Sequence, residues 1–189
     1  MRAEYINKDS FEAILRLMGR ENALALEVSV LTGLRIGDVL KIAPGDLREG
    51  WLYYTAQKTK KRGKKPIGLQ LQRRLLQNSR NNLCFPGRSG KKPRTRQAVF
   101  RDLQKACAAF SASRHISPHS ARKIYAADLY RKTDLATVQK ELQHTDPGTT
   151  LLYVDPGKRE GLTEMDFERI RYIIWECLYT FFRDEKSRS

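Results

Sequence analysis

Acidic residues, cysteine and long apolar runs are all scarce in this sequence. Its 189 residues include 36 Lys and Arg but only 21 Asp and Glu, which gives a formal net charge of +15. The three cysteines are too few and too far apart for a disulfide framework or a zinc site. No apolar segment approaches the roughly 20 residues of a membrane helix, and the N-terminus lacks the apolar core of an export signal. We therefore expect a cytoplasmic protein that does not span a membrane.

Apolar residues are nevertheless abundant enough to build a folded core. They make up 40% of the chain, which excludes a disordered basic tail. No internal repeat and no low-complexity linker divides the sequence. We therefore expect one main domain over residues 1–157, followed by a helical extension over residues 158–189 whose apolar stripe covers a core.

The positive charge is concentrated in the main part of the chain. Residues 1–153 hold 29 of the basic residues and 13 of the acidic ones, and two basic runs lie at 58–65 and 88–96. Glycine and proline interrupt both runs, which predicts loops. One such run alone is as typical of a solubilising surface as of phosphate binding. The total charge favours a polyanion, because each neutralised phosphate releases counterions. Nucleic acid is the leading partner.

Apolar spacing predicts a mainly α-helical chain with one small antiparallel β-hairpin or sheet, an α+β fold. The first helix is expected to be capped by Asp9 and stopped by Gly19, and the second to end at Gly33. Strands are expected at 51–55 and 66–69, with the first basic run at the tip of the hairpin. Further helices are expected at 36–42, 69–80, 95–110, 118–131, 135–142 and 163–182.

The segment SPHSAR combines a helix start with two basic side chains. Ser117 is a good N-cap and Pro118 suits the first helical position, so His119 and Arg122 should lie on one face of the first turn. A helix N-terminus already favours an anion, and these side chains would make it a phosphate site. The alternative is that both are cations tolerated at the surface, because His-x-x-Arg is common by chance.

The segment LQHTDPGTTLLYV places a histidine and a tyrosine around a turn. His144 follows an amphipathic helix, a Pro-Gly pair reverses the chain, and Tyr153 comes nine residues after the histidine. An imidazole and a phenol could then face each other. Taken alone, Tyr153 would more often be a packing residue with a satisfied hydroxyl.

The segment TGLRIGDVL places an arginine among apolar residues after a helix-stopping glycine. Arginine is rarely buried without a partner, so Arg35 is expected to need an anion. Asp38, three residues later on the same helical face, could be that partner or could orient the guanidinium toward a ligand.

Together these motifs resemble those of the tyrosine recombinases. TGLRIGDVL resembles their first arginine box, SPHSAR their His-x-x-Arg box, and QHTDPGTTLLYV their histidine-to-tyrosine box, with the likeness extending over roughly residues 8–155. The resemblance implies the fold of a tyrosine recombinase catalytic domain. It implies six catalytic side chains, namely Arg35, Lys58, His119, Arg122, His144 and Tyr153. Lys60 is the rival of Lys58 as the hairpin lysine. We expect DNA contacts at Lys60, Lys61, Arg62, Lys64, Lys65, Arg94 and Arg96.

The resemblance implies site-specific DNA recombination, whether integration, excision or inversion. Tyr153 would attack a DNA phosphate and form a 3′-phosphotyrosyl intermediate, with two arginines stabilising the charge of the transition state. His119 would accept the phenolic proton, His144 would donate to the phosphate, and Lys58 would protonate the leaving 5′-oxygen. Because the ester bond conserves energy, no ATP is expected, and no carboxylate cluster predicts a metal, so we expect no cofactor. The expected partner is double-stranded DNA, bound by a homo-oligomer that is a tetramer.

This sequence departs from the family pattern in two places. Only 34 residues precede Arg35, so we expect no N-terminal DNA-clamping domain, as in small single-domain members such as fimbrial-switch invertases, or else a catalytic piece of a longer protein. Gln143 stands where the family usually has glycine, and a left-handed backbone there would be strained. In the family a terminal segment often docks on a neighbouring protomer, so the extension 158–189 is a candidate for such exchange.

Other functions stay open. A catalytically impaired DNA-binding accessory or regulatory protein of the same fold would retain the basic face, and Gln143 favours that alternative. A different phosphodiesterase could use His119 and His144 as an acid and base pair on RNA, with Tyr153 structural. Type IB topoisomerase chemistry would give the same covalent adduct, but without pairing two DNA sites.

Overall fold

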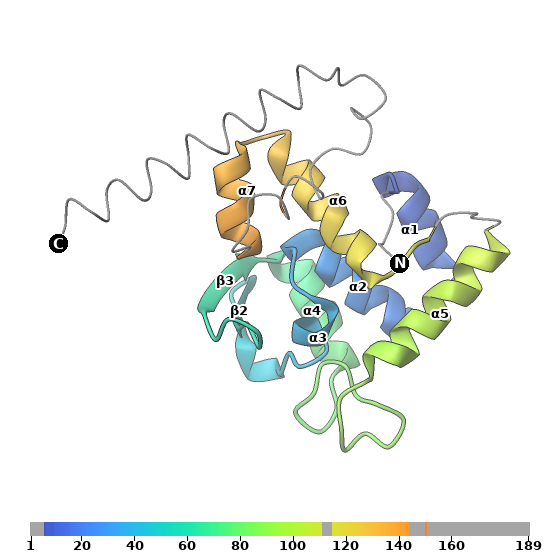
Figure 1. Cartoon of the computed structure of the whole chain (residues 1–189). Coiled ribbons are helices and arrows are strands. Elements are labelled where there is room, and N and C mark those ends of the chain that lie inside the picture. The colour runs from blue at the N-terminus through green and yellow to red at the C-terminus, as the bar shows by residue number, and fades with distance from the viewer. Residues whose placement is uncertain (1–5, 111–114, 144–149, 151–189) are drawn as a thin grey trace.

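A computed structural model describes residues 6–110, 115–143 and 150 of the chain (Figure 1). The described part is mostly helical, with a small antiparallel sheet at one side. The N-terminal elements are α1 (Lys8–Arg16), α2 (Arg20–Thr32), α3 (Ile36–Val39) and the 3-10 helix η1 (Pro44–Asp46). The sheet and the remaining helices are β1 (Leu47–Arg48), β2 (Trp51–Thr55), β3 (Arg62–Pro66), α4 (Gly68–Asn78), α5 (Arg96–Ala109), α6 (Pro118–Tyr130) and α7 (Leu135–Leu142). The predicted fold class is confirmed.

The N-cap of the first helix is Asn7 rather than Asp9. Asn7 has an extended backbone, and its side chain accepts a hydrogen bond of 2.8 Å from the amide of Ser10. This is an N-cap, so Asp9 lies inside α1 and the predicted cap was wrong. Gly19 is the N-cap of α2 rather than the stop of α1, which ends at Arg16.

The predicted end of the second helix at Gly33 is confirmed. Gly33 has a left-handed backbone with φ +70°, and its amide donates to the carbonyl of Ser29. A side chain at this position would also collide with α6, because a Cβ on Gly33 would lie 2.3 Å from Cδ1 of Tyr125. Glycine therefore allows both the chain reversal and the close packing of α6 on α2.

The sheet has the strand order β1-β2-β3, and both pairs are antiparallel. In the second pair Leu52 lies opposite Lys65 and Thr55 lies opposite Arg62. The prediction of a second strand at 66–69 was therefore wrong. Half of the first basic run forms β3, and Gly68 already begins α4.

The core lies between the N-terminal helices, the sheet and α5 and α6. Its largest fully buried side chains include Phe11, Ile14, Leu26 and Phe85. A smaller cluster joins α6 to α7 through Ala126, Val138 and Leu142. Cys84 and Cys107 are buried free thiols, and burial raises the pKa of Cys84 to about 12. Among the described residues, no helix is long and apolar enough to cross a membrane.

Several sequence-based predictions concern residues that the structure does not describe. His144, Tyr153, the predicted helix 163–182 and the extension 158–189 all lie outside the described residues.

Candidate active site

The start of α6 has the capped geometry that its sequence predicts. Ser117 has an extended backbone and its hydroxyl accepts a hydrogen bond of 3.3 Å from the amide of His119. In return, the amide of Ser117 donates to the hydroxyl of Ser120 at 3.3 Å. Pro118 occupies the first helical position, where its missing N–H is not needed. The cap fixes where the first turn of α6 presents His119 and Arg122.

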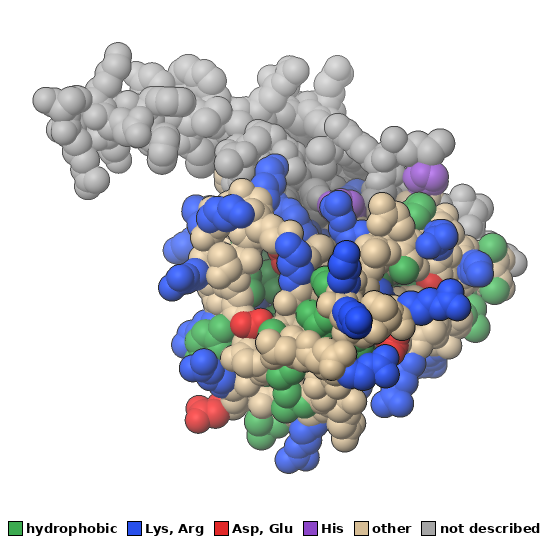
Figure 2. Space-filling view, turned by 90° about the horizontal axis from the view of Figure 1, so that it is seen from below, with side chains coloured by type: hydrophobic (Ala, Val, Ile, Leu, Met, Phe, Trp, Pro, Cys, Tyr) green, Lys and Arg blue, Asp and Glu red, His purple; other side chains and the backbone are tan. Residues whose placement is uncertain are grey.

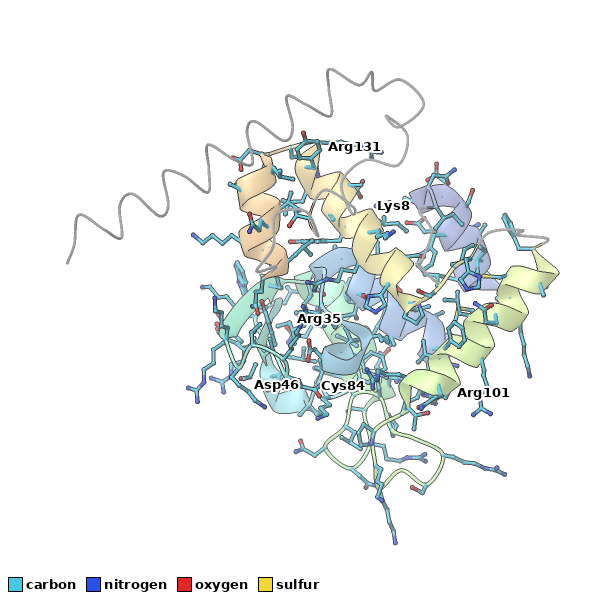
Figure 3. The ribbon with its side chains drawn as sticks, viewed as in Figure 1. Lys8, Arg35, Asp46, Cys84, Arg101 and Arg131 are labelled. Carbon is cyan, nitrogen blue, oxygen red and sulfur yellow. The ribbon has the colours of Figure 1, made fainter. Side chains whose placement is uncertain are left out.

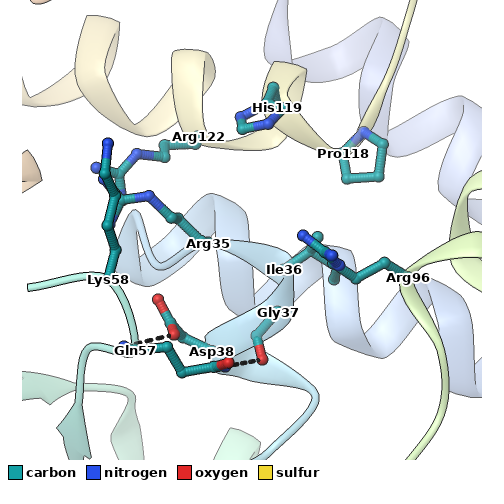
Figure 4. Close-up of a pocket in the computed structure, with 10 residues that line it drawn as sticks. All are labelled: Arg35, Ile36, Gly37, Asp38, Gln57, Lys58, Arg96, Pro118, His119 and Arg122. Atoms are coloured by element: carbon teal, nitrogen blue, oxygen red, sulfur yellow. Dashed lines mark hydrogen bonds between the residues drawn. The ribbon is translucent and has the colours of Figure 1, made fainter. Parts of the chain in front are cut away.

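Both side chains line a solvent-open cavity of about 360 Å³. The cavity lies between α3, the loop that joins β2 to β3, the start of α5 and the start of α6. Figure 4 shows the ends of Lys58, Arg35 and Arg122 close together, with His119 directed toward them. The basic and imidazole side chains of the lining are Arg35, Lys58, Arg96, His119 and Arg122. Asp38 is the only acidic residue among the ten described residues of the lining.

Arg35 brings an uncompensated positive charge to the cavity. It is the N-cap residue of α3, with an extended backbone, and its side chain is partly buried in the middle of the fold (Figure 3). Within the described part of the chain, no aspartate or glutamate lies within ion-pair distance of its guanidinium. A partly buried guanidinium of this kind favours an anionic ligand.

Asp38 does not form an ion pair with Arg35. Its Oδ1 accepts a hydrogen bond of 3.1 Å from the amide of Gln57, and the Gln57 side chain donates to the carbonyl of Gly37 at 2.6 Å (Figure 4). The carboxylate therefore positions the loop between β2 and β3 rather than the arginine. Lys58 follows Gln57 directly and lines the cavity.

Arg122 is held by the backbone of two other motifs. It is only 4% exposed, and its guanidinium donates to the carbonyl oxygens of Gly33 and Leu142. These carbonyls lie at the ends of α2 and α7, close in sequence to Arg35 and His144. Arg122 thus joins the three sequence motifs in space, while its position keeps a positive charge at the cavity wall.

The environment of His119 favours its neutral form. Partial burial lowers the pKa of His119, and the positive charges of Arg122, Arg35, Lys123 and Arg96 lower it further. His119 nevertheless remains exposed to solvent. An imidazole that is neutral at pH 7 can accept a proton, which suits the predicted role as a general base.

The structure separates the two candidate hairpin lysines. Lys58 lines the cavity, whereas Lys60 does not and has a left-handed backbone with φ 57°. The amide of Lys60 donates to the carbonyl of Ala56, which closes the loop. Lys58 is therefore the better candidate for a group that acts at the cavity.

The residues predicted to contact DNA fall into two groups. Lys60, Lys61, Arg62, Lys64 and Arg96 are exposed. Lys65 and Arg94 instead pair with acidic side chains. Figure 2 shows a face on which Lys and Arg side chains are widespread and Asp and Glu are few.

Lys65 is 7% exposed and donates to Glu141 and, at 3.0 Å, to the hydroxyl of Tyr125. The burial of Lys65 lowers its pKa, but the hydrogen bonds to Glu141 and Tyr125 outweigh it, so the net shift is upward. Arg94 forms an ion pair with Glu21 and donates to Asn22 at 3.2 Å. These contacts tie β3 and the second basic run to the helices.

Two polar residues near the site were missed at the sequence level. The Gln57 side chain anchors the loop to α3. The hydroxyl of Thr59 donates a hydrogen bond to Oε1 of Gln143, at the end of α7. Gln143 has a left-handed backbone, with φ 53° and ψ 44°, the condition under which the sequence predicts strain. Neither glutamine nor threonine is distinctive in a loop, so only tertiary structure could reveal the contact. Within residues 6–110, 115–143 and 150, no group of three or more His, Cys, Asp or Glu could hold a metal ion.

The sequence model of the phage integrase family matches residues 4–160. The chain belongs to this family of tyrosine recombinases. Its relatives include tyrosine recombinase XerC of Neisseria gonorrhoeae, 31% identical over 80% of this chain and 49% of the relative. The probable integrase/recombinase YoeC of Bacillus subtilis is 28% identical over 79% of this chain and 80% of the relative. The chain thus spans about half the length of XerC and most of YoeC.

Solved structures of the same family have the same fold. The lambda integrase catalytic core is 20% identical, with a TM-score of 0.63 over 77% of this chain and 94% of that structure. A lambda integrase dimer bound to a core site has a TM-score of 0.67 over 84% of this chain and 62% of that structure, also at 20% identity. The described fold is therefore that of a tyrosine recombinase catalytic domain.

Proposed function

We propose that this chain cuts and rejoins double-stranded DNA at specific sites through a 3′-phosphotyrosyl intermediate on Tyr153. The cavity supports the proposal because four positive side chains and one imidazole line it, against a single carboxylate that is already hydrogen-bonded to the Gln57 amide. A scissile phosphodiester is an anion of suitable size and charge for this environment.

In the first step, the phenolic oxygen of Tyr153 attacks phosphorus and the bond from phosphorus to the 5′-oxygen breaks. His119 takes the phenolic proton, and Lys58 gives a proton to the 5′-oxygen as it leaves. Arg35 and Arg122 stabilise the charge that grows on the non-bridging oxygens. His144, which follows α7, donates a hydrogen bond to the same phosphate.

In the second step, a 5′-hydroxyl attacks the phosphotyrosyl bond, and the proton transfers run in reverse. The ester energy is conserved between the two steps, so the reaction needs no nucleotide cofactor. The two arginines supply the positive charge that a metal ion would otherwise provide, and we propose that no metal is required. Integration, excision and inversion all use this pair of steps.

We propose that the exposed members of the basic runs hold the DNA backbone. Lys60, Lys61, Arg62 and Lys64 on the hairpin and Arg96 at the cavity are the contacts we expect. We leave Lys65 and Arg94 out of this set, because their charges are already paired within the fold. We also propose that four copies assemble on DNA, as in the solved structure of a lambda integrase tetramer bound to a Holliday junction. The extension 158–189 is the segment we propose to be exchanged between protomers.

The test is covalent capture of DNA. The full chain is incubated with a pool of nicked duplexes that carry randomised arms, and the mixture is then denatured in SDS. A recombinase gives a protein–DNA adduct that survives SDS and is absent in Tyr153→Phe. A nuclease that uses His119 and His144 gives free products, and its activity would survive Tyr153→Phe.

The left-handed Gln143 favours a second candidate, a DNA-binding accessory protein of the same fold that has lost cleavage. Such a protein would retain duplex in a native gel but form no adduct on any duplex of the pool. The covalent-capture experiment therefore distinguishes the two candidates directly.

A further inference from the structure

Gln143 occupies a strained position and uses its side chain. Its backbone is left-handed, with φ 53° and ψ 44°, a conformation that costs less for glycine than for any other residue. Its Oε1 accepts the hydroxyl hydrogen bond of Thr59, which lies 84 residues earlier in the loop between β2 and β3. A glycine here would relieve the strain but could not make this contact.

The contact completes a set of anchors around Lys58. On one side of Lys58, Gln57 is tied to α3 through Asp38 and the carbonyl of Gly37. On the other side, Thr59 is tied to the end of α7 through Gln143. Lys58 is exposed between these anchors and lines the cavity. Figure 4 shows the side chain of Lys58, the residue after the anchored Gln57, extending toward Arg35 and Arg122.

We propose that Gln143 is a positioning residue that, through Thr59, holds Lys58 over the cavity for proton transfer to the leaving 5′-oxygen. This inference rests on the proposed function. Gln143 directly precedes His144 in the sequence, so the same hydrogen bond also ties the loop of the general acid to the motif that continues to Tyr153. The left-handed glutamine is then a functional feature rather than a sign of lost cleavage.

If Gln143 positions the general acid Lys58, its effect on cleavage should depend on how much the leaving group needs a proton. A general acid must lie within hydrogen-bond reach of the atom that it protonates, so a loosened loop lowers the fraction of productive encounters. A sulfur in place of the bridging 5′-oxygen leaves as a thiolate, and thiols are far more acidic than alcohols, as the cysteine pKa of about 8.5 illustrates. That leaving group needs little help from an acid. Loss of the anchor should therefore slow cleavage of the oxygen substrate only.

The experiment measures single-turnover cleavage by the full chain on two duplexes of one sequence, selected by wild-type adduct formation. One duplex has the normal 5′-oxygen and the other a 5′-bridging sulfur. The test variants are Gln143→Gly and Thr59→Val. Thr59→Ser retains the hydroxyl, and Thr133→Val is the matched control, because it removes a threonine hydroxyl bonded to the Leu129 carbonyl outside the site.

We expect Gln143→Gly and Thr59→Val to cleave the oxygen duplex about fivefold more slowly, as the loss of one hydrogen bond allows. Both should cleave the sulfur duplex at the wild-type rate, and Thr59→Ser and Thr133→Val should match the wild type on both. The double variant that combines Gln143→Gly with Thr59→Val should cleave the oxygen duplex no more slowly than either single variant. Thermal unfolding of Gln143→Gly reports separately on the fold, because the relieved backbone strain offsets the lost contact.

Equal slowing on the two duplexes, or no slowing on either, would overturn the positioning role while leaving the proposed function intact. If the wild-type chain selects no duplex by adduct formation, even from a pool with bridging sulfur, the proposed function is overturned instead, and the positioning role with it. A folding defect is recognised by a lower unfolding midpoint in both test variants, and it would slow both duplexes alike.

Discussion

The guanidinium of Arg122 donates a hydrogen bond to the carbonyl oxygen of Gly33, 89 residues earlier in the chain. A second bond reaches the carbonyl of Leu142. One buried side chain thus connects the ends of α2 and α7. The arginine that the family resemblance assigns to catalysis is also a structural tie.

We therefore expect Arg122→Lys to affect the fold as well as cleavage. A lysine cannot satisfy both carbonyls in the same geometry, and leaving buried polar groups unpaired should lower the free energy of unfolding by ~2–4 kcal/mol. The control is Arg131→Lys, because Arg131 is exposed and pairs with Asp128 at the surface. That change should cost less than ~0.5 kcal/mol. Urea unfolding measures the stability of both variants. Similar unfolding midpoints for the two would contradict the proposed stabilising role of the Arg122 hydrogen bonds.

Gly33 should tolerate no side chain. Its φ of +70° and the 2.3 Å approach of a Cβ to Tyr125 both oppose alanine, so Gly33→Ala should lower the free energy of unfolding by at least ~2 kcal/mol. Gly45→Ala is the matched control, because a Cβ there meets nothing within 4 Å. Gly45→Ala should leave the free energy of unfolding nearly unchanged. Chemical denaturation measures both, and a neutral Gly33→Ala would show that α6 does not pack on α2 as described.

Lys65 should contribute to stability in a pH-dependent way. Its folded-state pKa is raised, so its contribution is fully present below the unfolded lysine pKa of about 10.4 and is lost as pH rises through the higher folded value. Stability curves measured from pH 9 upward should therefore show a steeper loss for the wild type than for Lys65→Met. Parallel curves would mean that the bond to Glu141 contributes nothing.

The same lysine should matter little for DNA. Lys65→Met should leave the dependence of duplex affinity on salt unchanged, whereas Lys61→Met should reduce the slope of log K against log salt by about 1. Lys61 belongs to the same hairpin and is exposed, so it is the matched comparison for the buried Lys65. Binding titrations at several salt concentrations test this, and a reduced slope for Lys65→Met would return that residue to the DNA interface.

His119 should set an acid limit on cleavage. Partial burial and then the nearby arginines lower the pKa of its imidazole, so the base form persists below the usual histidine value of about 6.5. The pH dependence of kcat/KM reports groups of the free enzyme, and kcat/KM should fall only below that pH. His119→Gln should be slower and should lack this acid limb. A wild-type limb above pH 6.5 would argue that another group is the base.

Local sequence chemistry predicted the features that depend on a few neighbouring residues. The start of α6 followed from Ser117 and Pro118, and the end of α2 from Gly33, since caps are set by short-range hydrogen bonds and by backbone freedom. The first cap was placed two residues too late, because Asn7 and Asp9 are both good caps and sequence alone does not rank them. Arg35, His119 and Arg122, which the family motifs assign to catalysis, line one cavity in the structure.

Features that depend on long-range pairing were not predicted. The strand Arg62–Pro66 is made of Arg, Gly, Lys and Pro, which have low strand preference, and it forms because β2 offers it backbone partners. Once paired, adjacent residues point to opposite faces, so Lys64 is exposed while Lys65 is buried. A basic run read as a uniform DNA-contacting loop could not reveal this alternation, nor the contact between Thr59 and Gln143.

The most direct test of the central claim is to identify the residue that becomes joined to DNA. After capture on a sulfur-bridged duplex, trypsin should release a peptide spanning residues 141–158, in which Tyr153 is the only tyrosine. Mass spectrometry should find the nucleotide phosphate on this peptide, and the released DNA strand should carry the 5′-thiol. A label on another peptide, or DNA cleavage with no labelled peptide, would contradict the account.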